Sequence, residues 1–139
     1  MLRVVLDTNQ LVSSLLSTQG PQRSLIDAWR RGEYLLLVGP GQIDEVAEVL
    51  ARPKIKKKYP IPPGDRDAFL HLLRQDALPL PQAPGPGSCR DPDDDHLLAC
   101  AEAGGTDHLV TGDADLLAIG HYRNLTIISA REFLTILSP

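Results

Sequence analysis

The sequence predicts an α/β fold built on a mainly parallel sheet. Short apolar runs alternate along the chain with longer amphipathic segments, which is the order of strands and helices in α/β proteins. The apolar runs are continuous and do not alternate with polar residues, as is typical of strands that are covered on both faces. We therefore expect a parallel sheet with helices packed against it.

Each predicted element follows from a local pattern. The apolar runs predict strands at residues 4–6, 35–38, 108–110 and 125–128. Helical periodicity predicts helices at residues 10–16, 22–31, 41–51, 64–76, 93–103 and 131–137. Residues 79–87 hold four prolines and two glycines, which predicts a connecting loop. Neither side of this loop has enough elements to close a core alone, so we expect one domain over residues 1–139.

Composition and charge exclude several classes of protein. Hydrophobic residues make up 42% of the chain and charged residues 23%, which fits a globular protein and not a disordered one. No apolar stretch is long enough for a membrane helix, so we expect no membrane association and a cytoplasmic location. The net charge is -4, but the two signs are segregated: residues 52–58 are mostly basic and residues 91–95 mostly acidic.

Carboxylates follow two of the predicted strands. Asp7 comes directly after the first strand, and Asp113 follows the strand at residues 108–110. In open α/β sheets the ligand crevice lies beyond the carboxyl ends of the strands, so both side chains are expected at the same edge. The alternative is that each residue only caps the helix that follows it. Thr8, Asn9, Thr111 and Asp115 lie in the same two motifs.

A third group of carboxylates opens the helix predicted at residues 93–103. Asp91 stands before a proline and is a natural N-cap, and acidic residues in a first turn complement the helix dipole. This explanation suffices for Asp91, Asp93 and Asp95. Asp94 differs because it shares a face with the apolar residues Leu97, Leu98 and Ala101. A carboxylate there is costly to bury unless it is paired or bound to a metal, so Asp94 is the candidate.

Glu45 is the fourth candidate, at the border of the apolar stripe of the helix predicted at residues 41–51. A solvated acidic face is the alternative there. If all four candidates converge, the site holds four carboxylates with no compensating cation. All-oxygen ligation is preferred by Mg²⁺ and Mn²⁺. Two such ions about 4 Å apart support in-line displacement at a phosphodiester, so the pattern favours nuclease chemistry.

These motifs, taken together, resemble those of the PIN-domain ribonucleases, and in particular the VapC-like toxins of toxin–antitoxin systems. The resemblance rests on four segments that occur in the order of the family and span nearly the whole chain: VVLDTN at residues 4–9, EVAEVLARPK at residues 45–54, DPDDD at residues 91–95 with Leu98 and Ala101, and VTGDADLL at residues 110–117. The resemblance implies a three-layer α/β/α fold with a central, mainly parallel sheet of four or five strands.

The resemblance also implies a function and assigns residues to it. The expected activity is Mg²⁺- or Mn²⁺-dependent endonucleolytic cleavage of RNA. The expected catalytic residues are Asp7, Glu45, Asp94 and Asp113, and the expected metal ligands are Asp7, Asp94, Asp113 and, as a further possibility, Asp115. Asn9 and Thr111 are expected as polar supports. The expected partners are the RNA substrate, a second copy of the chain in a homodimer, and an antitoxin protein.

The basic run and the histidines are interpreted separately. Arg52, Lys54, Lys56, Lys57 and Lys58 are candidates for contact with the RNA backbone, and a solvated helix end is the alternative. The four histidines show no metal-ligand spacing, although His96 lies close to the acidic turn.

Two other functions compete with the nuclease. The first is a PIN-like module with weak or no catalysis that binds RNA or a protein. The second is a phosphotransfer protein that is phosphorylated on Asp7. Its motif lacks the second aspartate two residues later that phosphohydrolases of that kind use, because Asn9 stands at that position.

Overall fold

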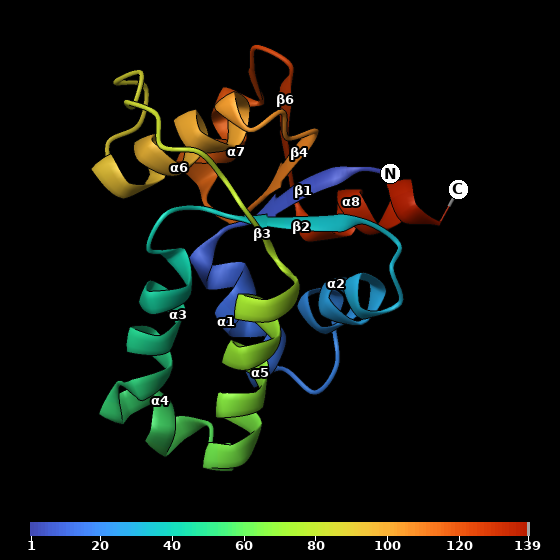
Figure 1. Ribbon diagram of the computed structural model, residues 1–139, viewed down its shortest axis with the longest axis vertical. Helices are drawn as coiled ribbons and strands as arrows, with labels where there is room; N and C mark the ends of the chain where they lie inside the picture. Colours follow the sequence, from blue (N-terminus) through green and yellow to red (C-terminus); the bar gives the residue numbers. More distant parts are fainter. Residues whose placement is uncertain (139) are drawn as a thin grey trace.

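A computed structural model describes residues 1–138 and confirms the α/β class. Within these residues, eight helices surround one six-stranded sheet (Figure 1). The strands are β1 (Arg3–Leu6), β2 (Leu35–Val38), β3 (Leu78–Pro79), β4 (His108–Val110), β5 (His121–Tyr122) and β6 (Leu125–Ile128). The helices are α1 (Thr8–Leu16), α2 (Pro21–Arg30), α3 (Gln42–Ala51), α4 (Pro53–Lys58), α5 (Pro63–Asp76), α6 (Pro92–Ala103), α7 (Ala114–Ile119) and α8 (Ala130–Leu137).

The sheet is larger than expected, since the prediction of four or five strands misses one or two. The missed strands are β3 and β5, which have two residues each and lie at the two edges of the sheet. Pro79 belongs to β3 although proline cannot donate a ladder hydrogen bond. This is possible because an edge strand needs donors on one side only. Leu80 supplies the next donor, and its N–H bonds the Val38 carbonyl at 2.8 Å.

The strand order is β3-β2-β1-β4-β6-β5, and all neighbours are parallel except β5 and β6. From the central β1, the chain first builds the sheet outward through β2 and β3. It then crosses to the other side of β1 and adds β4. The order therefore reverses between β1 and β4, and open sheets of this kind bind ligands beyond the carboxyl ends of strands at such a reversal.

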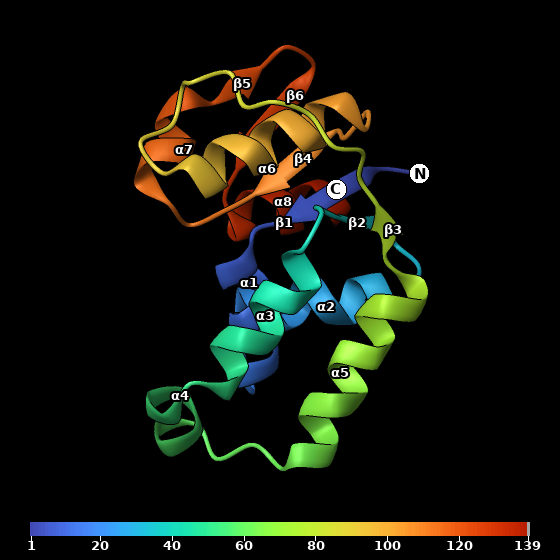
Figure 2. The same cartoon turned by 60° about the vertical axis from the view of Figure 1, so that its left-hand side comes forward.

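Alternate side chains of the strands enter two separate cores. Val4 and Leu6 pack with α1, α2, α3, α5 and α8 on one face, whereas Val5 packs with α6 and α7 on the other. Figure 2 shows α6 and α7 on one side of the sheet and α1, α2, α3 and α5 on the other. Residues 80–91, which we call the strap, run along the outside of α6 (Figures 1 and 2).

The basic run forms a helix of its own. Pro53 occupies the first turn of α4, where its missing N–H is not needed, and the chain turns at Arg52 between α3 and α4. The helix α4 contains no buried residue. Figure 2 shows α4 at the end of α3 that lies away from the sheet.

Two further features of residues 1–138 concern membrane spans and cysteines. No helix in this range combines the length and the apolar character needed to cross a bilayer. Cys89 and Cys100 are free thiols.

Candidate active site

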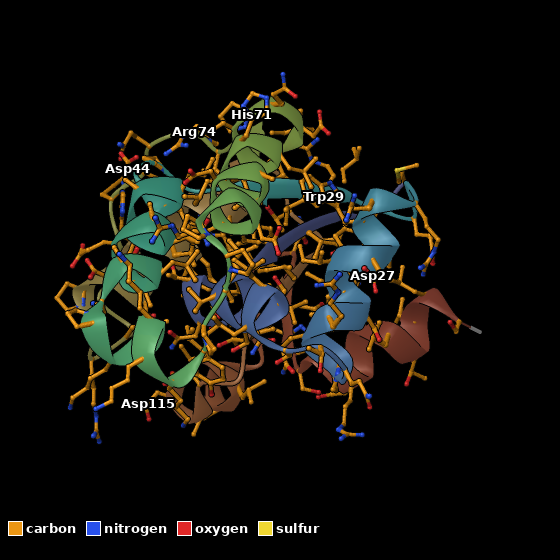
Figure 3. All side chains as sticks on the ribbon, turned by 90° about the horizontal axis from the view of Figure 1, so that it is seen from below. Asp27, Trp29, Asp44, His71, Arg74 and Asp115 are labelled. Atoms are coloured by element: carbon orange, nitrogen blue, oxygen red, sulfur yellow. The ribbon has the colours of Figure 1, made fainter. Side chains whose placement is uncertain are left out.

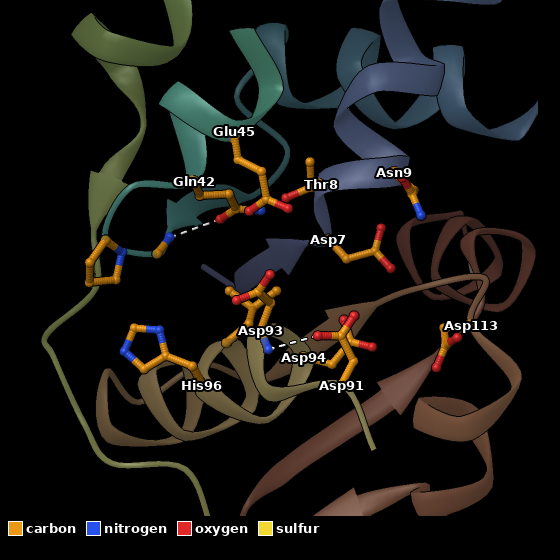
Figure 4. Close-up of a pocket in the computed structure, with 13 residues that line it drawn as sticks. Asp7, Thr8, Asn9, Gln42, Glu45, Asp91, Asp93, Asp94, His96 and Asp113 are labelled. Atoms are coloured by element: carbon orange, nitrogen blue, oxygen red, sulfur yellow. Dashed lines mark hydrogen bonds between the residues drawn. The ribbon is translucent and has the colours of Figure 1, made fainter. Parts of the chain in front are cut away.

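A pocket with an acidic lining opens where the strand order reverses, beyond the ends of β1 and β4. Its volume is about 270 Å³. Six carboxylates from four segments of the chain line it, and no lysine or arginine of the described residues does: Asp7, Glu45, Asp91, Asp93, Asp94 and Asp113. Figure 4 shows side chains of α1 and α3 facing those of α6 across this space. The four predicted catalytic carboxylates are therefore brought together.

Asp7 both caps a helix and lines the pocket. Its side chain is only 7% exposed. One carboxylate oxygen accepts the Gln10 N–H at 2.8 Å, as an N-cap does, and the other accepts the Thr111 hydroxyl. Burial raises the pKa of Asp7, while the hydrogen bond from Thr111 opposes this rise.

Thr111 connects the ends of the two central strands. Its oxygen accepts the Asp113 N–H at 3.0 Å while its hydroxyl donates to Asp7. The side chain is fully buried and lies beneath the pocket, not in its wall. The predicted polar support is therefore placed where it orients Asp7 and the chain that leads into Asp113.

Asp113 and Asp115 occupy different environments. Asp113 caps α7 by accepting the Leu116 N–H at 2.9 Å, and its side chain also lines the pocket. Asp115 is exposed and is not a lining residue; Figure 3 places it at the periphery of the molecule. Asn9 is exposed and lines the pocket. As at Asp7, the capping role and the place in the pocket belong to one residue, Asp113.

The carboxylates at the start of α6 have different roles. Asp91 is the N-cap and accepts the Asp93 N–H at 2.9 Å. Asp94 is half-buried at the pocket. Burial, followed by the negative charges of Asp91, Asp113 and Asp7, raises the pKa of Asp94 to about 6. The residue that its helical face predicts as the candidate, Asp94, is therefore one whose ionisation is opposed by its surroundings.

Glu45 reaches the pocket from α3. It is exposed at the pocket rim, and its pKa is raised by partial burial, which a hydrogen bond with the Thr8 side chain opposes. Its helix is anchored by Gln42, which is only 3% exposed. The Gln42 amide accepts the Gly39 N–H at 2.8 Å and donates to the Leu6 carbonyl at 2.7 Å.

Gln42 and Asp95 were missed as functional candidates by the sequence analysis. Gln42 ties the start of α3 to the end of β1, and so fixes Glu45 relative to Asp7. A signal was present, because Gln42 stands four residues before Val46 on the apolar stripe of α3. Asp95 faces away from the pocket and accepts hydrogen bonds from three backbone N–H groups of the strap. The periodicity of the sequence does not predict these contacts.

The predicted RNA-contact residues lie outside the pocket. None of Arg52, Lys54, Lys56, Lys57 and Lys58 lines it. Arg52 pairs with Glu48 at 3.7 Å, and the Lys58 ammonium lies 5.4 Å from the centre of the Tyr59 ring. Any contact of these residues with a nucleic acid would therefore involve a part of the strand away from the acidic pocket.

Solved structures share the fold. One is the crystal structure of PAE2754 from Pyrobaculum aerophilum, with 19% identity, a TM-score of 0.68, and coverage of 99% of this chain and 90% of that chain. Another is the crystal structure of FitAcB from Neisseria gonorrhoeae, with 15% identity, a TM-score of 0.54, and coverage of 92% of this chain and 98% of that chain. At these identities the likeness concerns the fold.

A comparison of sequences identifies the family of the chain, which the shared fold alone does not do. None of the curated proteins is significantly similar to the chain. The family model of the PIN domain, however, matches residues 3–115, a range that runs from β1 into α7 and includes all six lining carboxylates. With this match over most of its length, the chain belongs to the PIN domain family.

Proposed function

We propose that the chain is a metal-dependent endoribonuclease and the toxin of a toxin–antitoxin pair. PIN domains are generally nucleases that use divalent metal ions. The observation that carries the proposal is the convergence of six carboxylates on one pocket without a lysine or arginine in its lining. Such a group of like charges is unfavourable in itself, because each carboxylate opposes the ionisation of its neighbours.

The side chains around the pocket fit a hard divalent cation. They offer carboxylate, amide and hydroxyl oxygens, which Mg²⁺ and Mn²⁺ prefer. No three Asp, Glu, His or Cys side chains within residues 1–138 are grouped closely enough to enclose an ion by themselves. Mg²⁺ keeps several of its water ligands and is commonly held by one or two carboxylates, so water would complete its shell here. The raised pKa values of Asp7 and Asp94 mark the charges that a cation would relieve.

The carboxylates have distinct roles in this proposal. Asp7 and Asp94 would hold the principal metal, directly or through water. Glu45 and Asp113 would complete the shell or orient a water molecule. Thr111 holds Asp7 by its hydroxyl, Asn9 would be a further polar support, and Asp115, in the first turn of α7, would be an additional ligand only if α7 moved toward the pocket. The bound metal would supply an activated water and would stabilise the leaving oxygen of the phosphodiester.

The remaining parts of the proposal rest on the resemblance to PIN-domain toxins. They are RNA as the substrate, an antitoxin as a protein partner, a homodimer, and a cytoplasmic location. The helix α4, with its lysines, would hold the RNA backbone by charge alone, because phosphate contacts position a strand without reading its bases.

The test is cleavage of an end-labelled single-stranded RNA by the purified protein in Mn²⁺ or Mg²⁺. Asp94→Asn, purified in parallel, controls for a contaminating nuclease. We expect metal-dependent cutting by the wild type and none by the variant. Equal cutting by both proteins would assign the activity to a contaminant. Binding of metal without cutting of any RNA would favour the interaction module, and a phosphoaspartate formed with acetyl phosphate would favour phosphotransfer.

A further inference from the structure

Next to the acidic pocket lies a shallow depression that contains no carboxylate. Gln82, Ala83 and Pro84 of the strap line it together with His96 of α6, and its volume is about 380 Å³. His96 lines the acidic pocket as well. The two hollows therefore share one wall, and Figure 4 shows His96 at the margin of the acidic pocket. A ligand that extends beyond the acidic pocket on this side must pass over the His96 ring.

The His96 ring is held in one orientation. Its Nε2 lies 2.9 Å from the Gln82 amide oxygen and 3.4 Å from the Cys100 sulfur. Both contacts use the same edge of the ring, so the ring faces are not involved in them. An imidazole fixed in this way is a suitable platform for a planar group.

The strap that forms the other wall is also fixed in advance. The Asp95 carboxylate accepts the N–H groups of Gly87 and Ser88, each at 2.9 Å, and of Cys89 at 3.2 Å. Residue 85 must be glycine for this approach, because a Cβ there would lie 2.0 Å from a carboxylate oxygen of Asp95. Hydrogen bonds to an ionised acceptor are stronger than neutral ones. The strap is therefore anchored at residues 85–89, directly after the residues that line the depression.

The chemistry of the two hollows differs in a way that matches the two parts of a nucleotide. Phosphate with its metal suits the acidic pocket, but a nucleobase is uncharged and needs an uncharged surface. Proteins that bind single-stranded RNA stack bases on aromatic rings, histidine included, and read base edges with polar side chains. The Gln82 amide contacts His96 through its oxygen only, which leaves two N–H donors for a base.

We propose that this depression binds the nucleobase next to the scissile phosphate of a single-stranded RNA. The base stacks on the His96 ring, its edge meets the Gln82 amide, and Ala83 and Pro84 form the apolar wall. The inference rests on the proposed nuclease function and adds a subsite to it. It predicts a preference for certain bases at one position beside the cut.

Cleavage kinetics test the subsite. The substrates are four single-stranded RNAs that differ only in the base next to the mapped cut, in Mn²⁺. We expect His96→Ala to raise KM roughly tenfold or more, with kcat nearly unchanged, because the stacking that it removes contributes to binding. His96→Phe should restore most of the KM, since it keeps an aromatic face. Gln82→Ala should reduce the preference among the four bases.

A matched control and a spectroscopic signal separate this role from a structural one. His71→Ala removes an exposed histidine of α5 that lines neither the acidic pocket nor the depression, and it should change neither KM nor base preference. In an Asp94→Asn background, 2-aminopurine placed next to the scissile phosphate should lose fluorescence on binding. That quenching should disappear in His96→Ala and persist in His96→Phe.

The possible failures are distinguishable. If the wild type cleaves RNA but neither His96→Ala nor Gln82→Ala changes KM or base preference, the subsite is wrong and the nuclease stands. If His96→Ala lowers kcat without raising KM, His96 acts in the chemical step, and both the subsite and the all-carboxylate mechanism are wrong. If the wild type cuts none of the RNAs in either metal, the proposed function fails and the subsite with it.

Discussion

The carboxyl ends of β1 and β4 and the start of α6 supply carboxylates to the pocket in different ways. At the strand ends a single residue serves two purposes: Asp7 and Asp113 each cap a helix and also line the pocket. At the start of α6 the purposes are divided, since Asp91 is the cap, Asp94 faces the pocket and Asp95 holds the strap.

The difference shows that aspartates can have opposite roles when their side chains point in different directions. Asp94 and Asp95 are neighbours, yet burial and nearby carboxylates raise the pKa of Asp94, whereas backbone N–H donors led by Gly87 lower the pKa of Asp95. Successive residues of a helix point about 100° apart, which is enough to turn one carboxylate to the pocket and the next to the strap. At a strand end the sheet topology brings the carboxylate to the pocket, and the cap of the following helix fixes its side chain.

The largest expected effect is a difference in cleavage activity between the variants of Asp94 and Asp95. Asp94→Asn should lower metal-dependent cleavage by more than about a hundredfold, because loss of a group behind a metal ligand already costs about 10- to 100-fold. Asp95→Asn should retain most of the cleavage at saturating RNA, since Asp95 does not line the pocket and acts only through the strap. The measurement is the initial rate with labelled RNA, and Asp67→Asn on the surface of α5 is the control. Equal losses in both α6 variants would contradict the division of tasks.

The next effect tests whether the two strand ends act as one unit. Thr111→Val keeps the shape of the side chain but removes the hydroxyl that joins Asp7 to the Asp113 N–H. We expect Mn²⁺ affinity, measured by calorimetry, to fall about 10- to 100-fold. The free energy of unfolding should fall by about 1–3 kcal/mol, because buried polar groups lose a partner.

A matched threonine provides the control for that variant. Thr106 is also buried, but its hydroxyl has no hydrogen-bond partner within residues 1–138. Thr106→Val should therefore leave metal affinity unchanged and should not lower stability. If both valine variants behaved alike, the hydroxyl bridge between the strand ends would have no special importance.

A smaller effect concerns the stability of the metal-free protein. The change in stability should have opposite signs in Asp94→Asn and Asp95→Asn. The pKa of Asp94 is raised to about 6, so the folded state holds a proton that the unfolded state releases, and its contribution to stability is lost as pH rises toward 6. Asp94→Asn should therefore stabilise the metal-free protein at pH 7 by about 1 kcal/mol, after allowance for solvent screening.

Asp95 should behave in the opposite way. Its pKa is lowered, so its contribution to stability is present above the ordinary aspartate value and is lost as pH falls below that value. Asp95→Asn should lower the melting temperature at pH 7, and this difference should shrink in acid below about pH 4. Thermal melts of the wild type and both variants from pH 3 to pH 8, with EDTA, measure both effects. The same sign for both variants at pH 7 would contradict the comparison.

The smallest expected effect tests whether the helix α4 contributes to RNA binding. Reversing the charges of Lys56, Lys57 and Lys58 together should flatten the salt dependence of RNA affinity, by about 0.7 in log–log slope for each RNA phosphate that the lysines no longer neutralise. Binding is measured with Asp94→Asn so that the RNA stays intact, and Arg131→Glu on α8 is the control. An unchanged slope would remove α4 from the RNA path.

The four inner strands of the sheet could be predicted from the sequence, because burial on both faces of the sheet produces continuous apolar runs. The strands β1, β2, β4 and β6 appear within one residue of their predicted limits. The edge strands β3 and β5 have two residues each, too few for any periodicity, and are defined only by the neighbours with which they pair. The break between α3 and α4 was marked by Pro53, which starts the second helix and does not merely end the first.

The position of the site and its support at Thr111 could be predicted from the sequence, but the other supports could not. Asp7 and Asp113 follow from the rule for strand ends, and Asp94 from its helical face. Gln42, Asp95 and His96 act through partners distant along the chain or through a loop conformation, such as the Leu6 carbonyl and the strap. Spacing cannot reveal such partners. The roles proposed for all these residues stay predictions until the variants are measured.

The helix α4 also has a consequence for motion. None of its side chains is fully buried, Ile55 is only partly buried, and α3 is the element that it contacts most. Backbone hydrogen bonds that protect little apolar surface open at small cost, so its amides should exchange with solvent long before those of the sheet. Opening there would leave the carboxylates at the strand ends in place. If α4 holds RNA as proposed, its lysines could therefore rearrange around the RNA while the carboxylates at the strand ends keep their positions.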